Sequence, residues 1–129
     1  MIAEYSGTGP PPGAGGFATS RYWAEANAAR WAAAVNAEQR APLVLCDCDP
    51  FKLCYTWSLW RVGHSPAGEW RAARDASRQM FADNRLGVAD LILVSIPDQD
   101  ALAARRSADK TRTRRNFDLH RRLAEPIRE

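Results

Sequence analysis

Two short apolar runs interrupt a chain that is otherwise patterned for helices. Residues 43–46 read Leu-Val-Leu-Cys between Pro42 and Asp47, and residues 90–96 read Asp-Leu-Ile-Leu-Val-Ser-Ile before Pro97. Continuous apolar runs of this length, bounded by proline and aspartate, are typical of strands that are buried on both faces of a parallel sheet. The pattern therefore predicts two buried parallel strands.

Helical periodicity surrounds these runs. Beyond the first run, one helix face carries four residues at i, i+3, i+4 and i+7. They are Leu53, Thr56, Trp57 and Trp60. Gly63 follows this stripe and is expected to cap the end of the helix, because glycine adopts the left-handed conformation without strain. Further helices are expected over residues 21–40, 66–86, 98–106 and 117–124. Ser20, Ser65 and Asp98 are expected to cap the starts of the first three of these, and Gly87 follows the end of the helix at residues 66–86.

The first nineteen residues have a different composition. They contain Pro10 to Pro12 and a cluster of glycines, so they are expected to form a flexible leader before a single domain over residues 20–129. The Gly-Pro-Pro-Pro-Gly-Ala-Gly-Gly run does not match a phosphate-binding loop. It lacks a preceding buried strand, and Gly16-Phe17 stands where the Lys-Ser/Thr pair of such a loop would be.

Composition and charge narrow the function classes. The chain has 129 residues, a size suited to one domain, and its net charge of +3 is unevenly distributed. Residues 105–129 carry nine basic against four acidic side chains, and a local arginine cluster favours a phosphate-bearing partner. No apolar run approaches the roughly 20 residues of a membrane span, and no signal peptide is recognisable, so a cytoplasmic protein without a membrane partner is expected. Three cysteines close together, Cys46, Cys48 and Cys54, favour free thiols over a disulfide framework.

Candidate chemistry lies at the junction between the first predicted strand and the helix after it. Asp47 and Asp49 occupy this junction. In an open parallel sheet the carboxyl ends of the strands line the ligand crevice, where carboxylates can reach a phosphate-bound Mg²⁺. The alternative is an Asp-Pro turn and helix cap without chemistry.

The order of these motifs resembles the middle and later part of P-loop kinases. The match rests on Leu-Val-Leu-Cys-Asp-Cys-Asp-Pro-Phe-Lys-Leu, then Ala-Asp-Leu-Ile-Leu-Val-Ser-Ile-Pro-Asp, then Arg-Thr-Arg-Arg-Asn-Phe-Asp-Leu-His. The chain is most similar to bacterial AAA-type ATPases and to small kinases related to thymidylate and deoxynucleoside kinases. This resemblance implies a three-layer α/β fold, P-loop-NTPase-like, with a small, incomplete parallel sheet covered by helices.

The resemblance also implies roles for particular residues. Asp47, with Asp49 beside it, corresponds to the catalytic acid near the acceptor, and Asp47 to a ligand of Mg²⁺. The arginine-rich segment corresponds to the lid that closes on the phosphates of ATP, since guanidinium groups neutralise charge on the transferring phosphoryl group. The lid residues are Arg105, Arg106, Arg112, Arg114 and Arg115.

One family element has no counterpart in this sequence. No strand followed by Gly-x-x-x-x-Gly-Lys-Ser/Thr is present, so the chain resembles an internal segment of a kinase. The resulting hypothesis is a nucleotide-binding or phosphorylated-ligand-binding protein of kinase ancestry, inactive alone, that forms a homo-oligomer or recruits a strand-complementing partner. Two alternatives stay open: a non-catalytic protein-interaction module, and a nucleic-acid binder that uses residues 105–122. Nucleic acid is the less favoured partner.

Overall fold

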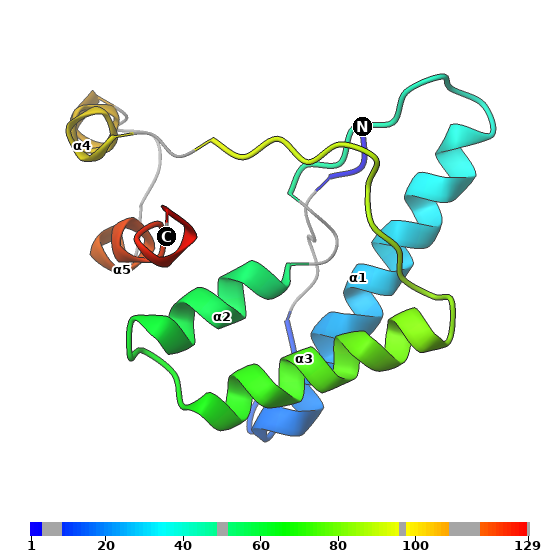
Figure 1. Ribbon diagram of the computed structural model, residues 1–129, viewed down its shortest axis with the longest axis horizontal. Coiled ribbons are helices and arrows are strands. Elements are labelled where there is room, and N and C mark those ends of the chain that lie inside the picture. The colour runs from blue at the N-terminus through cyan, green and yellow to red at the C-terminus, as the bar shows by residue number, and fades with distance from the viewer. Residues whose placement is uncertain (4–8, 49–51, 96–97, 109–116, 129) are drawn as a thin grey trace.

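Helices dominate the structure, a computed structural model that describes residues 1–3, 9–48, 52–95, 98–108 and 117–128. Helices α1, α2 and α3 form the main body, and α4 and α5 lie to one side (Figure 1). The elements are α1 (Gly16–Glu38), α2 (Leu53–Arg61), α3 (Ala67–Ala82), α4 (Gln99–Ala108), α5 (Phe117–Arg122) and the 3₁₀ helix η1 (Pro126–Arg128).

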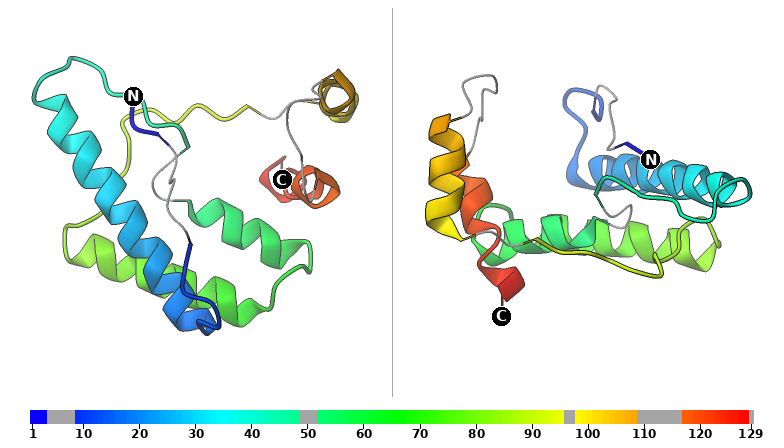
Figure 2. Two further views of the ribbon diagram at one scale, coloured as in Figure 1. Left: turned by 180° about the vertical axis from the view of Figure 1, so that it is seen from behind. Right: turned by 90° about the horizontal axis from the view of Figure 1, so that it is seen from above.

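The core forms where α1 crosses α3, and both views in Figure 2 show this crossing. Ala24 and Ala28 of α1 are buried against Met80 and, beyond the end of α3, Leu86. The alanines lie one helical turn apart, and their small side chains let the two helices approach closely. Helix α2 packs on α3, and η1 contacts α2.

Two helix ends depend on residues in the left-handed conformation. Gly63 follows α2 with φ of +71°, as the sequence predicts, and His64 N–H donates back to the Leu59 carbonyl at 2.9 Å. Helix α3 ends four residues earlier than predicted, because Asn84 adopts φ of +54° and Arg85 N–H bonds the Met80 carbonyl at 2.8 Å. Asparagine tolerates this conformation better than most residues, so it takes the role predicted for Gly87.

Gly87 has a packing role instead. A Cβ atom at this position would lie 2.3 Å from Cζ2 of Trp31 and 2.7 Å from Cε2. The indole ring of Trp31 therefore rests directly on the backbone of Gly87, at the edge of the core. Only a residue without a side chain leaves room for this contact.

The C-terminal elements contact α2 near both of its ends. The Arg122 guanidinium donates a hydrogen bond to the Val62 carbonyl at 2.9 Å, and the rings of Tyr55 and His120 lie 6.2 Å apart. Helix α4 begins as predicted after Asp98, whose Oδ1 accepts the N–H of Asp100 at 2.6 Å. This contact is an N-cap, which satisfies a donor at the free start of the helix.

The predicted three-layer α/β fold with a parallel sheet is wrong. Among the described residues the β structure is a single parallel bridge between Ile2 and Cys46, and residues 91–95 form no strand. Both predicted strands are also far from buried, since Leu43 is 71% exposed and Leu93 is 83% exposed. An apolar run fixes an extended backbone, but a sheet needs neighbouring strands to pair with, and pairing is a non-local property.

Helix α1 begins earlier than predicted, at Gly16 after Gly15 as N-cap. Ser20 therefore lies inside the helix, where its hydroxyl donates to the Gly16 carbonyl at 2.8 Å. Within the described part of the chain, no helix combines the length and apolar character that crossing a membrane requires.

Candidate functional site

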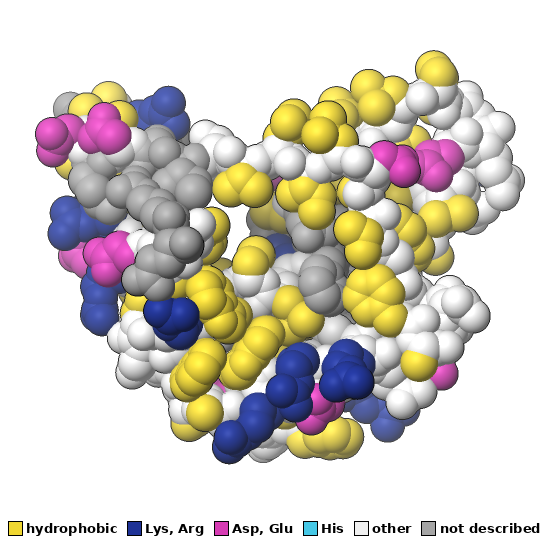
Figure 3. Space-filling model, in the orientation of Figure 1, with side chains coloured by type: hydrophobic (Ala, Val, Ile, Leu, Met, Phe, Trp, Pro, Cys, Tyr) yellow, Lys and Arg dark blue, Asp and Glu magenta, His cyan; other side chains and the backbone are white. Residues whose placement is uncertain are grey.

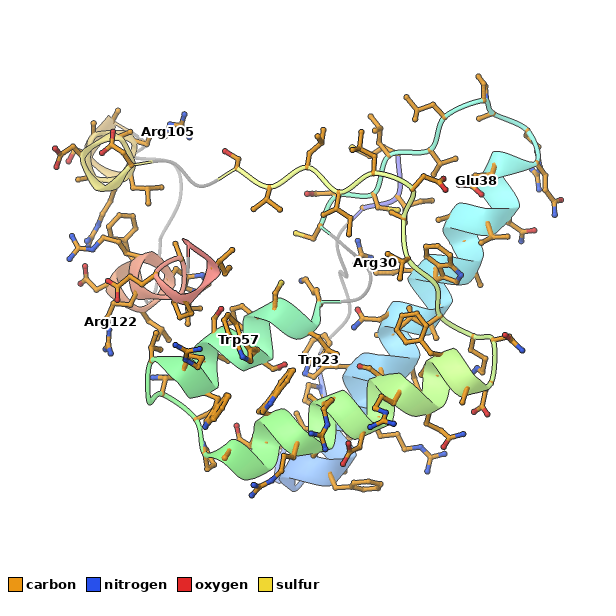
Figure 4. The ribbon with its side chains drawn as sticks, viewed as in Figure 1. Trp23, Arg30, Glu38, Trp57, Arg105 and Arg122 are labelled. Atoms are coloured by element: carbon orange, nitrogen blue, oxygen red, sulfur yellow. The ribbon has the colours of Figure 1, made fainter. Side chains whose placement is uncertain are left out.

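A buried arginine joins three separate parts of the chain. Arg30 lies in the middle of α1 and is only 7% exposed. Its Nε donates to the Ala3 carbonyl at 3.1 Å, and its Nη2 donates to the carbonyls of Asp47 and Cys48. Figure 4 shows Arg30 projecting from α1 toward these segments. We call this group of contacts the Arg30 clamp.

The clamp holds together the two segments of the parallel bridge. Ile2 N–H donates to the Leu45 carbonyl, and Asp47 N–H donates to the Ile2 carbonyl, both at 2.8 Å. The guanidinium meets the chain just beyond these bonds, at Ala3 and Cys48. A charged donor forms stronger bonds to carbonyl groups than a neutral one, so Arg30 fixes the end of the bridge.

The bridge pairs only one side of residues 43–46 with Ile2, and we call these residues the bridged edge. In a β ladder, successive residues direct their backbone groups to opposite sides. Because Leu45 and Asp47 bond Ile2, the backbone groups of Val44 and Cys46 point away from it. Among the described residues, neither Val44 nor Cys46 has a backbone hydrogen-bond partner. The bridged edge is thus open to one more strand.

A second open element is residues 88–95, which bend at Asp90 and then run straight toward α4 (Figure 1). We call these residues the extended segment. Its backbone makes no hydrogen bond to any other described residue, and its apolar side chains project into solvent. They are Val88, Leu91, Ile92, Leu93 and Val94, all exposed. Figure 3 shows hydrophobic side chains along this part of the surface. Exposed contiguous apolar surface marks an interaction site more often than an isolated exposed leucine does.

Of the predicted catalytic pair, Asp47 is described and Asp49 lies outside the described residues. The Asp47 side chain is exposed, while its backbone takes part in both the bridge and the Arg30 clamp. Within the described ranges, no group of three or more histidine, cysteine and acidic side chains is placed to hold a metal ion. Asp47 is therefore tied to the fold through its backbone, and among the described residues it belongs to no group of three or more possible metal ligands.

The predicted lid arginines are described only in part. Arg105 and Arg106 lie exposed on α4, whereas Arg112, Arg114 and Arg115 lie outside the described residues. Arg106 stacks on Phe117 at 4.6 Å and lies 3.9 Å from the Asp118 carboxylate. Figure 4 places Arg105 well apart from Arg30, so the structure does not bring Arg105 to the bridged edge near Asp47.

Comparisons with known proteins assign no family to the chain. Neither a protein-family model, nor a curated protein, nor a solved structure matches the chain. The candidate site rests on the Arg30 clamp, the bridged edge and the extended segment alone.

Sequence reasoning missed Arg30, although a signal for it exists. The buried face of α1 contains Ala24, Asn27, Ala28 and Ala34. Arg30 lies at the edge of that face, three residues after Asn27 and four before Ala34. A charged side chain beside a small-residue stripe must find acceptors, since burying it unpaired is costly. The pairing of Ile2 was also missed, because one isolated residue gives no strand pattern.

Proposed function

We propose that the chain is a protein-interaction module that associates with a partner chain by strand addition. The observation that carries the proposal is the state of the extended segment: its backbone groups are unpaired among the described residues, and Leu91 and Leu93 are 73% and 83% exposed. An added strand would satisfy the backbone groups and cover the apolar side chains in one step.

The physical case rests on burial of apolar surface. Covering a leucine or valine side chain contributes about 1.5–3 kcal/mol relative to leaving it in water. Five such side chains lie within the extended segment, namely Val88, Leu91, Ile92, Leu93 and Val94. Strand addition also supplies directional backbone hydrogen bonds, which give register to an otherwise non-directional apolar contact.

The proposal differs from nucleotide binding in the residues it uses. Nucleotide binding would depend on Asp47 and on the arginines near α4, which include the exposed Arg105 and Arg106. Strand addition depends on backbone groups and apolar side chains of the extended segment. Substitutions can therefore separate the two functions.

Site-specific photo-crosslinking tests the proposal. The photo-reactive residue p-benzoylphenylalanine is introduced at position 93, or at position 17 as a matched control. Phe17 is also strongly exposed, at 70%, but lies on the first turn of α1. In cells that produce the chain, irradiation should link position 93 to another polypeptide and leave position 17 unlinked. Equal linking at both positions, or none at position 93, would contradict strand addition.

A further inference from the structure

We infer that the occupant of the bridged edge is the extended segment of a second copy of this chain, so that two copies exchange segments reciprocally. This inference rests on the proposed function and identifies the partner. Each copy carries both halves of one contact. The bridged edge offers unpaired backbone groups at Val44 and Cys46, and the extended segment offers an unpaired backbone of similar apolar character.

Side-chain exposure supports the pairing of these two elements. On the bridged edge, Leu43 and Leu45 alternate with less exposed Val44 and Cys46, which leaves one apolar face open. The extended segment is exposed on both faces, as Leu93 and Val94 show. A strand added beside Val44 and Cys46 would place its side chains next to Leu43 and Leu45, within reach of cross-strand contacts.

Seven exposed apolar side chains are available to a dimer contact, and a standard specific interface buries roughly 800 Å² per partner. They are Leu43, Leu45, Val88, Leu91, Ile92, Leu93 and Val94. Reciprocal exchange uses this surface twice about a two-fold axis, which is the commonest symmetry of homo-oligomers.

The charge of the elements also permits two copies to meet. Residues 43–46 carry no formal charge, Asp47 follows them directly, and Asp90 is the one formally charged residue of the extended segment. Two like chains therefore bring few like charges together at this contact, even though each carries a net charge of +3. Charged side chains on an edge are a common means of blocking such pairing, and they are nearly absent here.

The primary measurement is molar mass by sedimentation equilibrium in reducing buffer, across a range of concentrations. The wild type should shift from 14.3 kDa to twice that mass as concentration rises toward about 1 mM. A chain that stays monomeric up to about 1 mM overturns the inference.

Two variants disable one half of the contact each. Leu93→Lys changes the extended segment, and Cys46→Pro removes the outward N–H of the bridged edge while leaving the Ile2 bonds to Leu45 and Asp47 in place. Each variant alone should be monomeric with unchanged helical circular dichroism. Val44→Pro provides a second edge variant in case Cys46→Pro disturbs folding. Phe17→Lys is the matched control and should dimerise like the wild type.

Mixing the two variants gives the decisive result. The intact segment of Cys46→Pro can pair with the intact edge of Leu93→Lys, so the mixture should form a heterodimer about 10- to 100-fold weaker than the wild-type dimer. A mixture without a heterodimer at about 1 mM overturns exchange. If the same apolar surface of both copies met in the dimer, mixing the two variants would not restore the contact. If position 93 crosslinks to a different polypeptide while the chain stays monomeric, the exchange inference fails and the interaction-module proposal stands.

Discussion

The Nε atom of Arg30 donates a hydrogen bond of 3.1 Å to the carbonyl oxygen of Ala3, which lies 27 residues earlier in the chain. This bond and those to Asp47 and Cys48 connect α1 to both segments of the parallel bridge. The helix is thus attached to the bridge through one guanidinium. The stability of the bridged edge should depend on this side chain more than on any apolar contact nearby.

Arg30→Met should lower the free energy of unfolding by about 2–4 kcal/mol, because three carbonyl groups lose a charged donor while most of the apolar stem is retained. Chemical denaturation followed by circular dichroism measures this change. Arg40→Met is the matched control, since Arg40 is exposed just beyond α1 and should change stability by less than about 0.5 kcal/mol. Equal effects of the two substitutions would contradict the clamp.

Gly87→Ala should destabilise the fold by about 1–3 kcal/mol, because the new methyl group would overlap the Trp31 ring. Gly68→Ala on α3 meets no atom within 4 Å and should be neutral or slightly stabilising. Combining Gly87→Ala with Trp31→Phe should recover part of the loss, which a double-mutant cycle measures. Additive effects would show that the two positions are not in contact.

The ion pair between Arg85 and Glu25 should make stability depend on pH in the acidic range. The Arg85 hydrogen bond lowers the pKa of Glu25, so its contribution is fully present above the ordinary pKa of a glutamate and is lost as pH falls through the lowered value. The melting midpoint of Glu25→Gln should therefore lie below that of the wild type at pH 7, and the two should converge as pH falls from the ordinary pKa of a glutamate through the lowered pKa of Glu25. A difference that persists below this range would show that the substitution acts through packing.

ATP hydrolysis tests the kinase hypothesis directly. We expect turnover far below about 1 s⁻¹, a usual kinase rate, because the sequence lacks the lysine and glycine-rich loop that hold the phosphates, and each such donor is typically worth a factor of about 10² or more. Phosphate release with Mg²⁺ measures it. Turnover near that rate, abolished by Asp47→Asn or by combined Arg112→Ala, Arg114→Ala and Arg115→Ala, would favour a phosphotransferase over an interaction module.

Local elements could be predicted from the sequence more reliably than the fold. Helix α2, its Gly63 cap and the Asp98 cap of α4 each depend on residues within one or two turns, and the structure confirms them. The end of α3 was misplaced because Asn84 adopts the conformation expected of glycine. The signal was present as an Asp-Asn pair, which favours turns.

The sequence could not show whether the two apolar runs form a sheet, because sheet formation depends on pairing between distant segments. The apolar run at residues 90–96 is compatible with a buried strand, yet the described part of it is extended and exposed. The Arg30 clamp has the same non-local character: spacing places Arg30 at the edge of the buried face of α1, but the three carbonyls it meets come from elsewhere in the chain. Asp49 and three of the lid arginines lie outside the described residues, and their roles stay predictions.

The bridge between Ile2 and Cys46 has a consequence for the order of folding. These two residues close a loop that contains all of α1. Local helix formation takes about a microsecond or less, whereas joining the ends of a long loop must first overcome its closure entropy. We therefore expect α1 to form before the bridge and to present Arg30 to the arriving segments. In the native state the bridge should open while α1 stays helical, so the amide protons of Ile2 and Asp47 should exchange with solvent faster than those in the middle of α1.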